Sequence, residues 1–139
     1  MTPETIVAIA AGSVIAVFVG FLAYKKLPKR PKKQKYVARW RELQSLCKDK
    51  STWRDAVIAA DKLLDRALKQ RKFKGKTPGE RLVSAQKKFS KNDQVWDAHN
   101  LYKKLIANEE RQPGEEETKK ALANFRQALR DLGALPSEK

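Results

Sequence analysis

The stretch WRDAVIAADKLLDRAL, residues 53–68, decides the fold of this chain. Its apolar residues recur every three or four positions, the period that places side chains on one face of an α-helix. The members of this stripe are Trp53, Ala56, Val57, Ala60, Leu63, Leu64, Ala67 and Leu68. A helix with one such apolar face and an otherwise polar surface must bury that face against other elements. The stretch therefore predicts one helix of a larger helical domain.

The segments on either side have the same helical spacing. Their apolar faces consist of Val37, Trp40, Leu43 and Cys47 before the stretch and, after it, Leu82, Val83, Ala85 and Phe89, then Val95, Trp96, His99, Tyr102, Leu105 and Ile106, and finally Ala121, Leu122, Phe125, Ala128, Leu129 and Leu132. No segment of useful length alternates with the period of two that indicates a half-buried β-strand. The sequence therefore predicts an all-α fold, an antiparallel bundle of four or five helices joined by short loops.

Start and stop signals separate these helices. Ser51 offers an N-cap for the helix of residues 53–68. Thr77, with Pro78 after it and Glu80 three positions later, predicts a capping box at the start of the next helix. Gly133 is expected to stop the last helix.

The start of the chain has the pattern of a membrane anchor. Residues 5–24 carry no charge, and seven Lys or Arg follow within residues 25–35. Twenty such residues in a helix span roughly 30 Å, the thickness of a bilayer core, and the cations that follow favour the cytoplasmic side. A cleaved signal peptide is the alternative, but no Lys or Arg precedes this apolar core. We expect a single-pass protein of the cell membrane, with its N-terminus outside and its C-terminal domain in the cytoplasm.

These signals divide the chain into four parts. They are an anchor (1–24), a basic linker containing Pro28 and Pro31 (25–35), a soluble helical bundle (36–135) and a tail (136–139). The cations of the linker are expected to contact the anionic inner leaflet of the bilayer and, by mutual repulsion, to keep the linker extended. They are Lys25, Lys26, Lys29, Arg30, Lys32, Lys33 and Lys35.

Small residues recur every fourth position in the predicted anchor, at Ala8, Gly12, Ala16 and Gly20. This spacing places them on one stripe, where two membrane helices can approach closely and gain van der Waals contact. The stripe suggests a homodimer, although Ala and Gly are also simply frequent in membrane helices.

Composition limits the chemistry of the soluble part. One cysteine, Cys47, excludes an intrachain disulfide, and one histidine, His99, leaves no plausible His/Cys metal site. No Gly-rich phosphate loop is present, so we expect no cofactor. The formal net charge of +15 favours an anionic partner, for which the candidates are the inner-leaflet lipid surface, RNA, DNA or an acidic protein.

A basic cluster surrounds one aromatic residue between the second and third predicted helices of the soluble part. Its members are Arg66, Lys69, Arg71, Lys72, Phe73, Lys74 and Lys76. Such cations can contact phosphates while an exposed aromatic ring stacks on a base. In the alternative interpretation, the cations stabilise the C-terminal end of a helix and Phe73 packs back onto the bundle.

Three short patterns occur together in this chain: WRDAVIAADKLLD at residues 53–65, GKTPGERL at 75–82, and WDAH at 96–99, which continues to IANE at 106–109. Together they resemble a family of small bacterial membrane-anchored proteins whose soluble part is similar to HEPN domains. The resemblance covers roughly residues 38–132. It implies a helical bundle, often dimeric, and in many HEPN domains a metal-independent ribonuclease that acts through an Arg and a His a few positions later.

The sequence departs from that family motif at its catalytic positions. Lys103 or Tyr102 replaces the expected Arg, and Asn108 replaces the expected second His. Asn cannot exchange a proton near neutral pH, and Lys lacks the planar fork that binds phosphate through two hydrogen bonds. His99, Lys103 and Lys104 are the residues left for an altered site, but His99 also lies on an apolar stripe, where a hydrogen-bonded, partly buried side chain is expected.

Three functions follow in order of preference. The first is a non-catalytic, HEPN-like module that recruits RNA, a ribonucleoprotein or an acidic protein to the cytoplasmic face of the membrane. The second is a structural membrane protein that acts through self-association. The third is a metal-independent ribonuclease with an altered site.

Overall fold

The computed structural model describes residues 32–137, which form five α-helices and three short 3₁₀ helices without a β-strand in that range. The α-helices are α2 (Lys33–Ser45), α3 (Trp53–Gln70), α4 (Pro78–Ser84), α5 (Asn92–Ala107) and α6 (Glu115–Asp131), and the 3₁₀ helices are η1 (Leu46–Lys48), η2 (Lys50–Thr52) and η3 (Gln86–Lys88). The predicted all-α helical bundle is confirmed.

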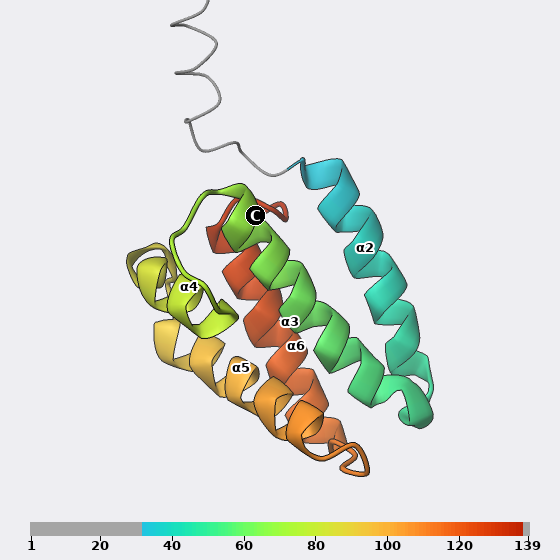
Figure 1. Ribbon diagram of the computed structural model, residues 1–139. Helices are drawn as coiled ribbons and strands as arrows, with labels where there is room; N and C mark the ends of the chain where they lie inside the picture. Colours follow the sequence, from blue (N-terminus) through green and yellow to red (C-terminus); the bar gives the residue numbers. More distant parts are fainter. Residues whose placement is uncertain (1–31, 138–139) are drawn as a thin grey trace, which may run out of the picture.

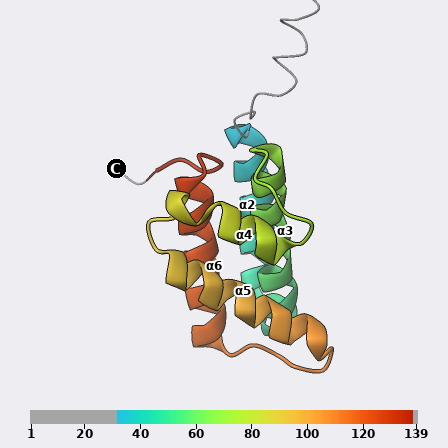
Figure 2. The ribbon, with the colours of Figure 1, turned by 60° about the vertical axis from the view of Figure 1, so that its left-hand side comes forward.

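Helix α3 lies at the centre of the bundle and contacts α2, α4, α5 and α6 (Figures 1 and 2). The pairs α2–α3 and α5–α6 run antiparallel, and the start of α2 lies at the same end of the bundle as the end of α6. The loop between α5 and α6 lies at the opposite end. The described chain therefore begins at one pole of the bundle and places the α5–α6 loop at the other.

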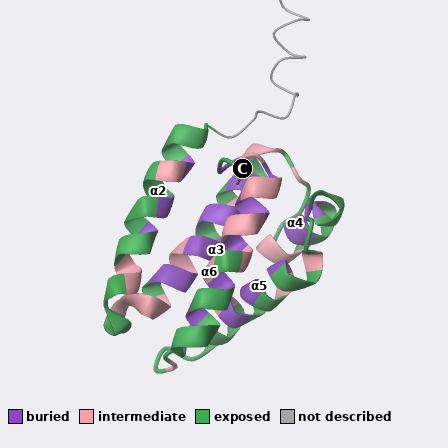
Figure 3. Ribbon diagram, turned by 180° about the vertical axis from the view of Figure 1, so that it is seen from behind, coloured by how far each residue is buried: buried purple, intermediate pink, exposed green. Residues whose placement is uncertain are grey.

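Small residues allow α3 to pack closely against its neighbours. Ala56, Ala60 and Ala67 on α3 have no exposed surface, and Ala128 of α6 is equally buried. Because the distance between two helices depends on the side chains at their contact, alanine on both helices permits a close approach. Larger side chains, with Phe125 among the most buried, make up the rest of the core. The buried faces point inward along each helix (Figure 3), as the apolar stripes predicted.

Two of the predicted helix ends are confirmed. The Thr77 side chain accepts a hydrogen bond from the Glu80 backbone N–H, and the Glu80 carboxylate accepts one from Thr77, which completes the capping box of α4. Gly133 follows α6 with φ +77°, a left-handed conformation that glycine adopts at little cost. The predicted cap at Ser51 is wrong: Thr52 is the N-cap position of α3, and the Ser51 backbone N–H instead bonds to Asp49.

Three other predicted details differ from the structure. The first helix of the bundle begins at Lys33, so the last residues of the predicted linker 25–35 are helical; their exposed side chains tolerate a first helical turn. Val83 and Ile106 were expected on inner faces but are 51% and 49% exposed. The helix expected to reach Phe89 ends at Ser84, whose hydroxyl bonds back to the Glu80 carbonyl, and η3 then turns Phe89 into the core.

The predicted anchor, its small-residue stripe and the linker cations up to Arg30 lie outside the described residues. Within residues 32–137, each helix is too short or too polar to cross a bilayer.

Candidate functional site

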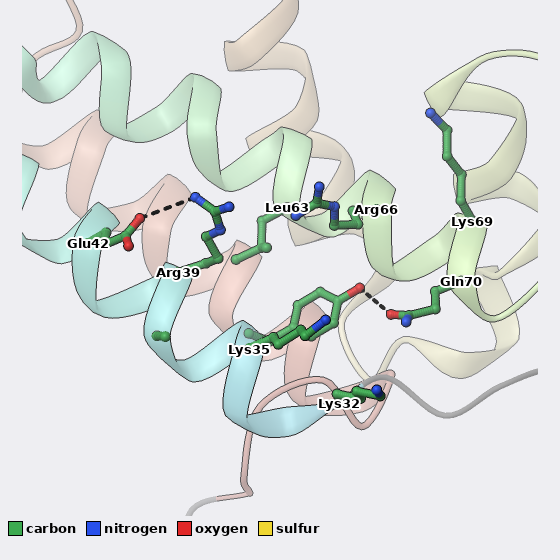
Figure 4. A pocket seen from close by; sticks show the side chains of 10 residues that line it. Lys32, Lys35, Arg39, Glu42, Leu63, Arg66, Lys69 and Gln70 are labelled. Carbon is green, nitrogen blue, oxygen red and sulfur yellow. Dashed lines mark hydrogen bonds and ion pairs between the residues drawn. The ribbon is translucent and has the colours of Figure 1, made fainter.

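A groove of about 810 Å³ runs between α2 and α3 (Figure 4). Five of the side chains that line it are cationic and only one is acidic: Lys32, Lys35, Arg39, Arg66 and Lys69 against Glu42. The remaining lining residues are Tyr36, Ala38, Leu63 and Gln70. We call this surface the α2–α3 groove. It joins two of the predicted linker cations to two members of the predicted cluster around Phe73.

The packing of α2 creates the groove. Tyr36 and Leu63 are buried and form its floor. The Tyr36 hydroxyl donates a hydrogen bond of 2.6 Å to Gln70 Oε1, which ties α2 to α3 at this end. Burial raises the pKa of the Tyr36 phenol above its ordinary value, and the charge of Arg66 opposes that rise. The phenol therefore stays neutral and can keep donating.

The cations of the groove remain accessible to a ligand. Arg39 is paired with Glu42 at 3.4 Å, but both side chains are more than half exposed, and such a pair holds its members weakly. Lys69 lies 3.4 Å from Asp65, and its side chain is 63% exposed. Lys35 and Arg66 are also exposed. These charges are displayed to solvent, where an anion can reach them.

The rest of the predicted cluster lies on the loop after α3, where Arg71 and Phe73 make contacts within the fold. The Lys72 backbone has φ +64°, its N–H bonds to Lys69, and the Phe73 N–H bonds back to Leu68. This hydrogen-bond pair is a Schellman motif, in which an apolar residue at the position of Phe73 packs against the last helical turn. Phe73 is half-buried against the core, and the Arg71 guanidinium lies 5.9 Å from its ring centre. The packing alternative therefore describes Phe73.

The other cations of that loop do not line the groove. Arg71 donates to the Leu132 carbonyl at 2.9 Å, whereas Lys72, Lys74 and Lys76 are exposed. The predicted cluster therefore combined two sets of cations that lie in different places: Arg66 and Lys69 line the groove, whereas the cations from Arg71 onward lie on the loop. What the sequence did not reveal was Arg39, which α2 adds to the groove from a distant part of the chain.

His99 belongs to a buried pair with an acidic side chain. Its Nδ1 lies 2.7 Å from Asp61 Oδ1, and both side chains are at most 5% exposed. The imidazole stacks on Tyr102 and meets the edge of Trp96. Burial raises the pKa of Asp61, while its hydrogen bond to His99 acts in the opposite direction. The predicted hydrogen bond of His99 is confirmed, its partner is an aspartate from α3, and the side chain is buried more completely than the predicted partial burial.

An ion pair lies one helical turn further along α3. Arg81 of α4 donates to both carboxylate oxygens of Asp65, at 2.6 and 2.9 Å, and to the Gly75 carbonyl at 2.9 Å. Arg81 is 7% exposed, so its charge needs these partners. Sequence reasoning missed both pairs. The available signal was that Asp61 continues the spacing of Val57 and Leu64 on the buried face of α3.

The residues of the degenerate family motif do not form one site. His99 is buried and bonded to Asp61, while Lys103 and Lys104 are exposed on α5. Asn108 follows the last residue of α5, and its side chain accepts a hydrogen bond from the Glu110 N–H. Among residues 32–137, no three His, Cys, Asp or Glu side chains are grouped to hold a metal ion.

Comparisons with protein-family models, with curated proteins and with solved structures found no match. The α2–α3 groove, with its five cations, is therefore the feature of the described residues on which a functional assignment rests.

Proposed function

We propose that this chain is a membrane-anchored, non-catalytic, HEPN-like module that recruits an anionic partner, such as RNA, a ribonucleoprotein or an acidic protein, to the cytoplasmic face of the membrane. One observation carries the proposal: α2 and α3, from separate parts of the sequence, bring five cations to one groove with a single carboxylate. The patterns at residues 53–65, 75–82 and 96–99 support the HEPN-like assignment.

The charge of the groove is the physical reason for this choice of ligand. Like charges held on facing helices repel one another, and an anion between them relieves that repulsion. Binding of a polyanion also releases its condensed counterions, so affinity falls steeply with salt. Because the groove cations are exposed, they can keep part of their hydration when they contact an anion, which limits the desolvation cost of binding.

RNA retention by the full chain in nanodiscs of phosphatidylcholine tests the proposal, because this neutral lipid adds no competing anionic surface. We would measure retention of a mixed-sequence RNA across a salt series in three proteins. They are the unmodified chain, the groove variant Lys35→Glu/Arg66→Glu and the control variant Lys103→Glu/Lys104→Glu. The two variants change net charge equally, and all four residues are exposed.

We expect the groove variant to lose retention and the control variant to keep most of it. In the groove variant, the slope of log K against log salt concentration should become less negative by about 0.7 for each single-strand phosphate contact removed. The same series with a polyglutamate peptide tests an acidic protein as the partner. Equal losses in the two variants would show only a general charge effect and would overturn the assignment of the groove.

The two alternative functions give different results in the same experiment. Shortened RNA without metal, dependent on His99, would indicate a ribonuclease. A self-associating structural protein would instead dissociate in detergent on Gly12→Leu/Ala16→Leu, and its RNA retention would not change. Intact RNA retained only through the groove favours the binding module over both.

A further inference from the structure

We infer that the anionic partner seated in the α2–α3 groove is the membrane itself: the groove faces the inner leaflet, and its cations bind the phosphate groups of anionic lipids. This inference rests on the proposed function for the membrane-anchored, non-catalytic module, and it makes the inner leaflet, in place of RNA or a protein, the occupant of the same groove. Three properties of the described residues favour lipid phosphates over a nucleic acid or a protein.

The first property is the position of the groove in the chain. Lys32, one of its lining residues, is where the described chain begins. The predicted anchor ends at Tyr24, so the seven residues 25–31 separate it from Lys32 at the end of the groove. Even fully extended, the chain from Tyr24 to Lys32 spans at most about 29 Å. A groove tethered so close to a bilayer meets lipid phosphates at a very high local concentration.

The second property is the absence of an aromatic platform. Among residues 32–137, the only large hydrophobic side chains with substantial exposure are Val83 and Ile106, and neither lines the groove. Tyr36, the aromatic residue of the groove, is 4% exposed and forms its floor. Proteins that hold single-stranded RNA combine cations with exposed rings on which bases stack. A groove that displays five cations and no exposed ring is suited to phosphate groups without bases.

The third property is the distribution of acidic residues. The five acids near the α5–α6 loop are Glu109, Glu110, Glu115, Glu116 and Glu117. This loop lies at the pole opposite the start of α2 (Figures 1 and 2). A domain whose groove faces an anionic leaflet therefore keeps this acidic loop away from the same surface. Long, flexible Lys and Arg side chains also allow several lipids to be contacted without a rigid fit.

Energy transfer from the bundle to the lipid surface tests the inference in the full chain. Cys47 is the only cysteine, so a Cys47→Ser background accepts one dye at a chosen position. Ala38→Cys places the dye on the lining of the α2–α3 groove, and Ala123→Cys places it on the recess between α5 and α6. Both alanines are exposed, so the two substitutions are matched. The acceptor is a dye on lipid headgroups.

We expect phosphatidylglycerol, added to phosphatidylcholine vesicles, to increase transfer from position 38 but not from position 123. High salt should reverse the increase, because the Debye length falls from about 10 Å at 0.1 M to about 3 Å at 1 M. The variant Lys35→Glu/Arg66→Glu should abolish the increase in transfer. Each cation removed lowers the ratio of docked to free bundle by about fivefold. Lys103→Glu/Lys104→Glu should leave it in place.

Transfer that does not respond to phosphatidylglycerol, or that rises equally from both positions, would overturn the inference. RNA or polyglutamate retention in neutral nanodiscs separates that failure from a failure of the proposed function. Groove-dependent retention without docking on lipid would leave the module intact with a macromolecular partner. Loss of both would remove the groove as a binding site.

Discussion

His99 Nδ1 and Asp61 Oδ1 lie 2.7 Å apart in the core, where α5 packs on α3. Each side chain is at most 5% exposed, so neither charge nor hydrogen-bonding group can be satisfied by water. This relationship explains why a histidine and an aspartate are found on apolar stripes. It also makes the pair a structural element of the bundle and keeps His99 from serving as a free acid or base at the surface.

Removal of Asp61 should therefore destabilise the bundle strongly. We expect Asp61→Ala to lower the free energy of unfolding by about 1–3 kcal/mol, because the His99 imidazole is left buried without its hydrogen-bond partner. Urea unfolding of the full chain in a non-ionic detergent, followed by far-ultraviolet circular dichroism, measures the change. Lys62→Ala, at the adjacent exposed position of α3, should change it by at most about 0.5 kcal/mol. Similar losses in the two variants would contradict this role.

The Arg81–Asp65 pair should depend on the shape of the guanidinium as well as on its charge. Arg81→Lys keeps the charge but loses the two-pronged contact with Asp65, so we expect a loss of about 2 kcal/mol in unfolding free energy. Lys69 is the other cation near Asp65, and the Lys69 side chain is 63% exposed. Lys69→Ala should therefore cost at most about 1 kcal/mol of unfolding free energy. Thermal unfolding of the two variants gives the comparison. A larger loss for Lys69→Ala would reverse the ranking.

Lys72 offers a site where a substitution should stabilise the fold. Its φ of +64° is a left-handed conformation that strains any residue with a Cβ. Lys72→Gly relieves that strain at the end of α3, and we expect unfolding free energy to rise by up to about 1 kcal/mol. Lys74→Gly in the same loop, at a position without positive φ, should bring no gain. The denaturant midpoints of the two variants test this prediction. A midpoint raised only by Lys72→Gly supports relief of strain, whereas equal rises would show a nonspecific effect of lost charge.

Alkaline pH should destabilise the bundle partly through two tyrosines. Burial raises the pKa of both Tyr36 and Tyr102 above the ordinary value. Because the unfolded chain then loses these protons first, their contribution to stability is full below about pH 10. It is lost as the pH rises through the raised pKa values of the folded state. The double variant Tyr36→Phe/Tyr102→Phe should show a shallower loss of stability above pH 10. In the unmodified protein, tyrosinate absorbance should appear at a higher pH in the folded chain than in the unfolded chain. Identical pH profiles would contradict the prediction.

Local signals in the sequence were sufficient for the elements of the bundle. The stripe of residues 53–68 became α3, and the Thr77–Glu80 capping box and the stop at Gly133 are present because each depends on residues only a few positions apart. Val83 and Ile106 were misassigned for a local reason as well. An apolar residue at the edge of a stripe is buried only if a neighbouring helix happens to cover it.

Partners across the bundle required the tertiary structure. The position of Asp61 on an apolar stripe indicated that it needed a partner, but 38 positions separate it from His99. Arg39 and Arg66 line one groove only because α2 packs along α3 in the register set by Tyr36 and Gln70. The sequence by itself determined the all-α class and most helix boundaries, since these follow from spacing and capping within a few residues. Only the tertiary structure decided which charges are buried in pairs and which are displayed together, because that depends on how the helices pack.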